Sequence, residues 1–251
     1  MRPWYETAFG RDYLERYPHR DDAEAQADVA AIVELIEPDR RLPLLDLGCG
    51  AGRHLLAFCE AGFRDLVGLD LSRELLNIAR ERIAEAGCSV RDLHCCDMRT
   101  IPYEAHFATA VSIFTSFGYF KTDDEDAKVL SAVHRALRPG GRFLVDTLHR
   151  ESTIARIVPE EDVELPGGRG HITRTVSEDG KRVEKIVRFE PEDGAAEAVR
   201  RESVRMYAPE EITEMFEAAG FVDVRVYGSL RGEPIGPDAP RLVLVGRKDA
   251  P

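Results

Sequence analysis

Apolar and polar positions follow two different periods along the chain. Short apolar runs, such as residues 42–47 and 65–70, are typical of buried strands, whereas residues 52–62 and 73–87 carry the apolar stripe of an amphipathic helix. Strands that alternate with helices of about ten to fifteen residues predict an α/β protein with a parallel, doubly wound sheet. We expect the remaining strands at residues 90–97, 108–114, 142–148, 221–228 and 241–248, and the remaining helices at residues 126–137 and 208–220.

Several helix boundaries carry recognisable capping residues. Ser72 is a plausible N-cap for the helix at residues 73–87, and Thr122 with Glu125 forms a capping box before the helix at residues 126–137. Gly62 is placed to close the helix at residues 52–62. These signals support the predicted order of elements.

The first forty residues read as helical. Val29, Ile32, Val33 and Ile36 share one face of a helix whose first turn is acidic. We therefore predict that residues 1–40 form an N-terminal helical cap.

Residues 151–205 interrupt the alternation of strands and helices. They read as antiparallel strands, with Asp179 and Gly180 as a hairpin turn. Ligands bind at the carboxyl ends of the strands in such sheets, so an insertion after the fifth strand is placed to cover a substrate; the alternative is an embellishment that only extends the core. We expect residues 41–150 and 206–251 to form the α/β unit, and strands at residues 171–176, 182–189 and 198–207 within the insertion.

The composition narrows the classes of function. The net charge of −12, from 46 acidic and 34 basic residues, disfavours a nucleic acid as partner. Five cysteines without a C-x-x-C spacing disfavour a zinc site or a disulfide framework, so we predict no metal. The chain shows neither a signal-like apolar segment at its start nor a long apolar run, so we expect a cytoplasmic protein that does not enter a membrane.

The segment LLDLGCGAGRH, residues 44–54, is a glycine loop that follows a strand and opens a helix. A dinucleotide fingerprint G-x-G-x-x-G would require a third glycine where Arg53 stands. The carboxylate of Asp46 lies two residues before Gly48, which disfavours a pyrophosphate and favours a ligand that carries an ammonium group. S-adenosylmethionine carries such a group and no phosphate.

Two further acidic residues follow at strand ends. Asp70 lies twenty residues after Gly50, where a carboxylate accepts hydrogen bonds from ribose hydroxyls. This feature alone fits NAD equally well. Asp97 ends the third predicted strand, where it can accept from an adenine amino group while Met98 packs on the ring.

Together these motifs resemble the class I S-adenosylmethionine-dependent methyltransferases. The matching stretches are LLDLGCGAG, VGLDLS, CCDMRTIP, LRPGG and the terminal AAGFVDVRVYG with LVLVGRK; the chain departs from the family at Ala108, where an acidic residue is common. The resemblance implies a Rossmann-like, doubly wound, seven-stranded sheet whose last strand is antiparallel. It implies cofactor contacts at Asp46, Gly48, Gly50, Asp70, Leu71, Asp97 and Met98, to which we add the loop residues Cys49, Gly52 and Arg53.

The catalytic residues are less clearly marked. Methyl transfer requires the acceptor to be held in line with the methyl group, and a hydroxyl or ammonium acceptor also needs a base. His149, after the fifth strand, is our preferred base, and Tyr119, after the fourth, is the second candidate. Tyr5, Phe9, Tyr13 and Tyr17 recur every four residues, either as a core stripe or as a lid in which Tyr13 or Tyr17 contacts the sulfonium.

The acceptor is predicted to be a small molecule. The chain has no N-P-P-Y-type tetrad and no Pro-Cys nucleophile after the fourth strand, features that nucleobase methylation would use. We therefore expect methyl transfer from S-adenosylmethionine to an oxygen or nitrogen of a small metabolite, by a monomer or homodimer. The alternatives are a non-catalytic S-adenosylmethionine-binding module and an NAD(P)-dependent oxidoreductase on a similar fold.

Overall fold

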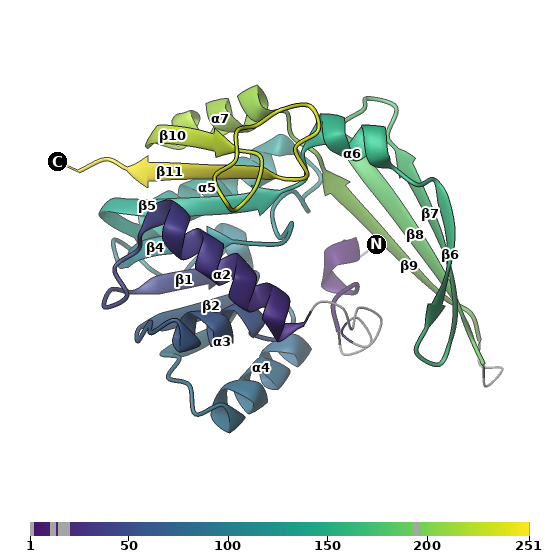
Figure 1. The fold of residues 1–251 in the computed structure, drawn as a ribbon, viewed down its shortest axis with the longest axis horizontal. Helices are drawn as coiled ribbons and strands as arrows, with labels where there is room; N and C mark the ends of the chain where they lie inside the picture. Colours follow the sequence, from purple (N-terminus) through teal and green to yellow (C-terminus); the bar gives the residue numbers. More distant parts are fainter. Residues whose placement is uncertain (1–2, 11–13, 15–20, 193–195, 251) are drawn as a thin grey trace.

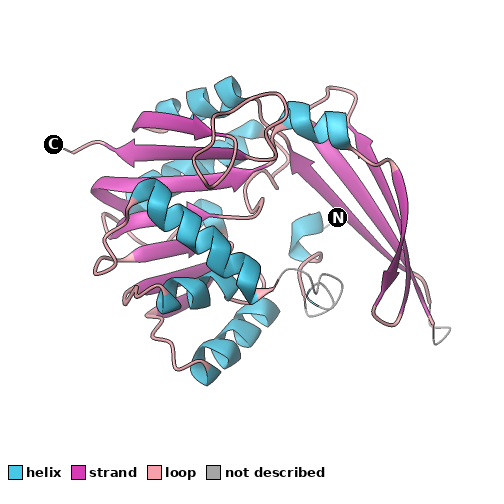
Figure 2. Cartoon of the chain, in the orientation of Figure 1, coloured by secondary structure: helices cyan, strands magenta, loops and turns pink. Residues whose placement is uncertain are grey.

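The computed structural model describes residues 3–10, 14, 21–192 and 196–250. The strands of these residues form two β-sheets (Figures 1 and 2). The larger sheet has seven strands in the order β10-β11-β5-β4-β1-β2-β3. Its strands are parallel except at β11, which runs antiparallel to both β5 and β10. The predicted doubly wound sheet with an antiparallel last strand is confirmed. The strands are β1 (Leu44–Leu47), β2 (Leu66–Asp70), β3 (Asp92–Cys95), β4 (Phe107–Ser112), β5 (Leu137–Thr147), β10 (Phe221–Tyr227) and β11 (Leu242–Lys248).

A separate hydrophobic core covers each face of this sheet. Alternate side chains of a strand point to opposite faces, so Leu44 packs in one core and Leu45 in the other. The first core is completed by α2 (Asp22–Ile36), α3 (Arg53–Glu60) and α4 (Arg73–Glu85), and the second by α5 (Asp123–Ala136) and α7 (Pro209–Ala218). No helix within the described ranges is long and apolar enough to cross a membrane.

The capping residues act as predicted. The Ser72 hydroxyl accepts a hydrogen bond from the backbone N–H of Leu75, and Thr122 and Glu125 form the reciprocal capping box of α5. Gly62 follows α3 in a left-handed conformation, with φ of 95°. One boundary differs, because α5 ends at Ala136 and β5 begins at once, so that the R-P-G-G segment lies within a strand.

The inserted region forms a second, antiparallel sheet in the order β6-β7-β8-β9. The predicted turn at Asp179 and Gly180 is present, but the sequence pattern missed both α6 and the acidic strand β6. Strand β6 lies at the edge of the sheet with mostly exposed side chains, so it lacks the apolar alternation that marks a half-buried strand. The elements are α6 (Arg150–Arg156), β6 (Glu160–Leu165), β7 (Gly168–Val176), β8 (Arg182–Pro191) and β9 (Ala198–Arg205).

The N-terminal segment lies between the two sheets. A short 3-10 helix, η1 (Trp4–Glu6), sits against β9, between the carboxyl edge of the larger sheet and the inserted sheet (Figure 1). Helix α2 confirms the helix predicted in the first forty residues, and Asp21 caps its start. Tyr13 and Tyr17 fall outside the described residues.

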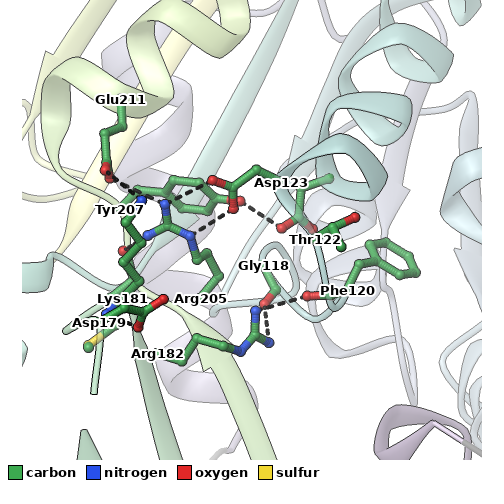
Figure 3. A network of polar contacts seen from close by, with 12 residues as sticks. Gly118, Phe120, Thr122, Asp123, Asp179, Lys181, Arg182, Arg205, Tyr207 and Glu211 are labelled. Atoms are coloured by element: carbon green, nitrogen blue, oxygen red, sulfur yellow. Dashed lines mark hydrogen bonds and ion pairs between the residues drawn. The ribbon is translucent and has the colours of Figure 1, made fainter. Parts of the chain in front are cut away.

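A polar network joins β9 and the residues that follow it to helix α5 (Figure 3). Arg205, at the end of β9, donates to both carboxylate oxygens of Asp123 at 2.8 and 3.1 Å. The Tyr207 hydroxyl donates to Oδ2 of Asp126 at 2.6 Å, and both residues are fully buried. Burial raises the pKa of Asp126 to about 7, although the Tyr207 hydrogen bond and the charge of Arg182 oppose the shift.

The raised pKa makes Asp126 a source of pH-dependent instability. An aspartate in the unfolded chain is already ionised well below pH 7, so folding takes up a proton here and stability falls as the pH rises from about 4 through about 7. Asp126→Asn removes this penalty and keeps an acceptor for Tyr207. We expect the variant to have a higher Tm than the wild type at pH 8 and a shrinking difference toward pH 4, measured by thermal denaturation across pH. Asp124→Asn removes an exposed carboxylate from the same helix and controls for the loss of one charge; a variant less stable than the wild type at pH 8 would contradict the assignment.

Candidate active site

A cavity of about 450 Å³ lies at the carboxyl edge of the larger sheet. The loop after β1 and the ends of β2, β3 and β4 line it, together with Tyr5, Phe9, Leu14, Asp21 and Asp22 from the N-terminal region. Among the described residues, those of the inserted sheet are absent from its walls. The volume is in the range of small-molecule sites, which is about 300–1,000 Å³.

The glycine loop has the backbone geometry that only glycine adopts readily. Gly48, Gly50 and Gly52 have φ values of 82°, 52° and 80°, in the left-handed region. A Cβ at Gly48 would also come within 2.7 Å of Ser116, on the segment after β4. Helix α3 begins directly after Gly52, so its free N–H groups face this loop. Cys49 lines the cavity but is almost fully buried.

Asp46 is the buried carboxylate beside this loop. Only 2% of it is exposed, it is not on the cavity wall, and its Oδ2 has no hydrogen-bond partner among the described residues. Burial raises its pKa to about 6, with the charge of His54 acting in the opposite direction. A buried carboxylate oxygen without a partner is costly, and an ammonium group brought to this end of the cavity would satisfy it.

Asp70 and Asp97 lie on the wall of the same cavity. Asp70 accepts hydrogen bonds from the backbone N–H groups of Gly50 at 2.8 Å and Ser72 at 2.7 Å; burial nevertheless raises its pKa. Partial burial would raise the pKa of Asp97, but hydrogen bonds from Arg99 hold it below its usual value. The Asp70 carboxylate therefore keeps further acceptor positions for a ligand, whereas the Asp97 carboxylate is engaged by Arg99 through both oxygens.

Apolar side chains flank these acids. Leu71 is 39% exposed, unusually so for a large aliphatic residue in this chain, and it lines the cavity with Met98. Both side chains are placed where they could contact a planar ring; the packing of Met98 on adenine stays a prediction.

Three side-chain contacts hold the region of α2 against the first turn of α3 and the last turn of α4. Arg53 pairs with Glu24 at 2.5 Å and His54 with Asp28 at 3.2 Å. Arg82 of α4 pairs with Asp22. Arg53 also lies over the Phe114 ring, 4.7 Å from its centroid, and reaches the cavity wall.

Aromatic rings form another part of the wall. Tyr119 stacks on Phe9 with ring centroids 5.5 Å apart and packs edge-on against Trp4 at 4.9 Å. Tyr5 packs edge-on against Phe120 at 5.3 Å. Tyr5, Phe9, Phe114, Tyr119 and Phe120 all line the cavity, so the stripe in the sequence contributes to the site at Tyr5 and Phe9.

The turn after β4 is strained and is held by Asp146 of β5 and by Arg241, which directly precedes β11. Phe114 and Thr115 both have left-handed backbones, with φ of 59° and 64°, which is uncommon for residues other than glycine. The Asp146 carboxylate accepts from the N–H of Phe114 at 2.9 Å and from Arg241 at 2.6 Å. Arg241 also donates to the Thr115 hydroxyl at 2.9 Å. Neither Asp146 nor Arg241 lines the cavity, so they act on it through Phe114.

The position of His149 corrects one sequence-based prediction. His149 is 2% exposed and does not line the cavity; its Nδ1 lies 3.4 Å from the carbonyl oxygen of Ala239. His149 follows β5 and so lies at the edge of the sheet that carries the cavity, but its side chain packs into the interior beside α6. Tyr119, the second candidate, does reach the cavity.

Sequence reasoning missed several residues of this site. Asp21 and Asp22 line the cavity although the pattern marked them only as the start of a helix. Phe114 was one of many apolar residues at a strand end, and only its backbone conformation sets it apart. Trp4 carried no signal beyond being the single tryptophan of the chain.

Comparison with known proteins identifies the class. A family model described as a methyltransferase domain matches residues 44–141. The dTDP-3-amino-3,4,6-trideoxy-alpha-D-glucopyranose N,N-dimethyltransferase of Streptomyces venezuelae is 31% identical over 206 residues, which cover 80% of this chain and 84% of the relative. The cypemycin N-terminal methyltransferase of a Streptomyces species is 26% identical over 80% of this chain and 81% of its own length.

The fold agrees with this likeness. The CcbJ methyltransferase of Streptomyces caelestis superposes with a TM-score of 0.79 over the full length of both chains, at 18% identity. The chain belongs to the class I S-adenosylmethionine-dependent methyltransferases. It is a methyltransferase that uses S-adenosylmethionine as the methyl donor, so the alternative of an NAD(P)-dependent oxidoreductase is rejected.

The residues present fit this cofactor. The unpartnered carboxylate oxygen of Asp46 suits the ammonium of its methionine end. The carboxylates of Asp70 and Asp97, with Leu71 and Met98, provide acceptors and apolar faces for ribose and adenine. We propose these residues, with Gly48, Gly50, Gly52 and Arg53, as the cofactor contacts.

The proposed ammonium contact predicts a pH dependence. A protonated Asp46 cannot attract an ammonium group, and its pKa is about 6. The affinity for S-adenosylhomocysteine, measured by calorimetry, should therefore rise about tenfold from about pH 5 to about pH 7 and then level off. Asp46→Asn should bind more weakly and lose this dependence. Asp39→Asn removes an exposed carboxylate with a pKa of about 2 and should retain the wild-type profile; an unchanged slope in Asp46→Asn would count against the contact.

Proposed function

We propose that the protein transfers the methyl group of S-adenosylmethionine to the amine nitrogen of a small molecule, with an amino sugar as the favoured acceptor class. One similar protein is named as the N,N-dimethyltransferase of a dTDP-linked amino sugar, and another as the cypemycin N-terminal methyltransferase. The sugar relative is the more similar of the two. The proposal also rests on the aromatic side chains that line the cavity.

The aromatic wall is the observation that carries the proposal. Phe9, Tyr119 and Phe120 offer ring faces and edges beside the cofactor residues. When an amine attacks a sulfonium methyl group, the positive charge passes from sulfur to nitrogen, and aromatic rings stabilise a cation at either position. Asp21 and Asp22 line the same cavity, where Asp22 pairs with Arg82.

The residues of this site act chiefly by positioning. S-adenosylmethionine, when bound, supplies a methyl group made electrophilic by its sulfonium. Asp46, Asp70 and Asp97 would orient the cofactor, and Tyr119 with Phe9 would hold the acceptor nitrogen in line. Holding reactants in an attack geometry can supply about 7–11 kcal/mol of the barrier. A neutral amine needs no base before attack, which agrees with the burial of His149.

Matched acceptors test the choice of nitrogen. The purified protein is incubated with S-adenosylmethionine and pairs of sugars that differ only by an amino or a hydroxyl group, each free and as a dTDP conjugate. We expect mass spectrometry to show methylation of the amino member only. The free and conjugated arms distinguish the form of the sugar. Methylation of the hydroxyl member alone would contradict the proposal.

The role of Tyr119 is tested separately. If the ring holds the acceptor, Tyr119→Phe should keep kcat within about threefold, whereas Tyr119→Leu should raise the KM for the acceptor about tenfold. Neither variant should change the affinity for S-adenosylhomocysteine. A fall in kcat of about a hundredfold in Tyr119→Phe would instead assign the hydroxyl to proton removal.

A further inference from the structure

Arg182, at the start of β8, contacts the backbone of the segment that carries Tyr119 (Figure 3). Its Nη1 donates to the carbonyl oxygen of Phe120 at 2.9 Å, and its Nη2 donates to that of Gly118 at 3.5 Å. These two carbonyls stand on either side of Tyr119. The guanidinium thus spans the one residue of this segment that stacks on Phe9.

Arg182 is itself held in place by the neighbouring strand. Its Nε donates to the hydroxyl of Ser203 at 2.9 Å, and its Nη2 donates to the carbonyl oxygen of Ser203 at 2.7 Å. Ser203 is on β9. Because these bonds fix the plane of the guanidinium, the position of the inserted sheet determines where the two carbonyls of the segment are bound.

Gly118 allows β9 and the segment that carries Tyr119 to approach each other closely. The N–H of Arg205 donates to its carbonyl oxygen at 2.8 Å, which extends the edge of β9 onto the segment. A Cβ at Gly118 would lie 2.9 Å from the carbonyl oxygen of Arg205, and its φ of 95° also requires glycine. The segment is therefore docked against the inserted sheet by its backbone.

In the described part of the chain, residues of the inserted sheet are absent from the cavity walls, so this sheet acts on the cavity through the segments that pack against it. We propose that Arg182 is a positioning residue, through which the inserted sheet sets the place of Tyr119 and hence the fit of the methyl acceptor. The effect on the acceptor rests on the function proposed above. The link between Arg182 and the Tyr119 environment does not.

The chemistry of arginine suits this task. The guanidinium has five N–H donors in a fixed plane, and here it reaches four acceptors on two elements. A lysine ammonium has three donors at a single point and cannot span the same distance. Arg182→Lys should therefore retain the charge and only part of the effect.

The single tryptophan provides a readout of this link. Trp4 packs against Tyr119, so its fluorescence reports on the position of that ring. In Arg182→Met we expect a shifted Trp4 emission maximum and acrylamide quenching raised about twofold, while the affinity for S-adenosylhomocysteine stays within about twofold. Arg182→Lys should lie between Arg182→Met and the wild type.

A matched control and a double variant separate positioning from general loosening. Arg174→Met removes another part-buried arginine of the inserted sheet, whose partners Val158 and Glu161 lie within residues 151–205, and should leave Trp4 emission unchanged. If Arg182 acts through the Tyr119 segment, Arg182→Met should have no further effect on Trp4 in the Tyr119→Leu background. Equal and additive effects of Arg182→Met in both backgrounds would overturn the proposal.

Kinetics complete the test. With an amine acceptor identified as above, Arg182→Met should raise the KM for the acceptor about tenfold and change kcat by less than about threefold. Unchanged Trp4 emission with a lower Tm would show that Arg182 only stabilises the fold, and so would overturn the inference. If no acceptor is found, the function proposed above fails, and the fluorescence arms still test the link between Arg182 and Tyr119.

Discussion

The reversal of strand order between β1 and β4 is the constraint on which the active site depends. From β1 the chain builds outward through β2 and β3, and from β4 it builds in the other direction through β5. The connections that leave these two neighbouring strands therefore diverge, and a crevice opens at their carboxyl ends. The glycine loop lies on one side of this crevice and Phe114 on the other. Gly48 is the point of contact, since a side chain there would strike Ser116.

The two halves of the site are built in different ways. The proposed cofactor half comes from residues 46–98, where Asp46 lies within β1, Asp70 ends β2 and Asp97 follows β3, with the glycine loop between them. The proposed acceptor half, formed around Phe114 and Tyr119, does not come from one continuous stretch of the chain. Phe114 is held in a strained conformation by Asp146 and Arg241, and Tyr119 is bracketed by Arg182, all from segments that come later in the chain. Trp4 and Phe9 come from its beginning.

This difference explains which features could be read from the sequence. Asp46, Asp70 and Asp97 could be placed near one another from the sequence because the strand ends of a parallel sheet meet at one edge; their role as cofactor contacts stays a prediction. His149 satisfied the same rule but packs inward, because the rule locates an edge and says nothing about side-chain direction. Strand β6 was missed because an exposed edge strand has no apolar period. The contact of Arg182 with the Tyr119 segment could not be found, since its partners there are backbone carbonyls more than sixty residues earlier, which leave no sequence pattern.

The contacts of Arg182 limit which residues of the Tyr119 segment can be substituted. They engage the carbonyl oxygens of Gly118 and Phe120 and none of the side chain between them. Residue 119 can therefore be replaced without loss of the hydrogen bonds that position it, while Gly118 cannot, because the carbonyl oxygen of Arg205 occupies the space of a Cβ. The backbone of this segment is thus fixed independently of the side chain at position 119.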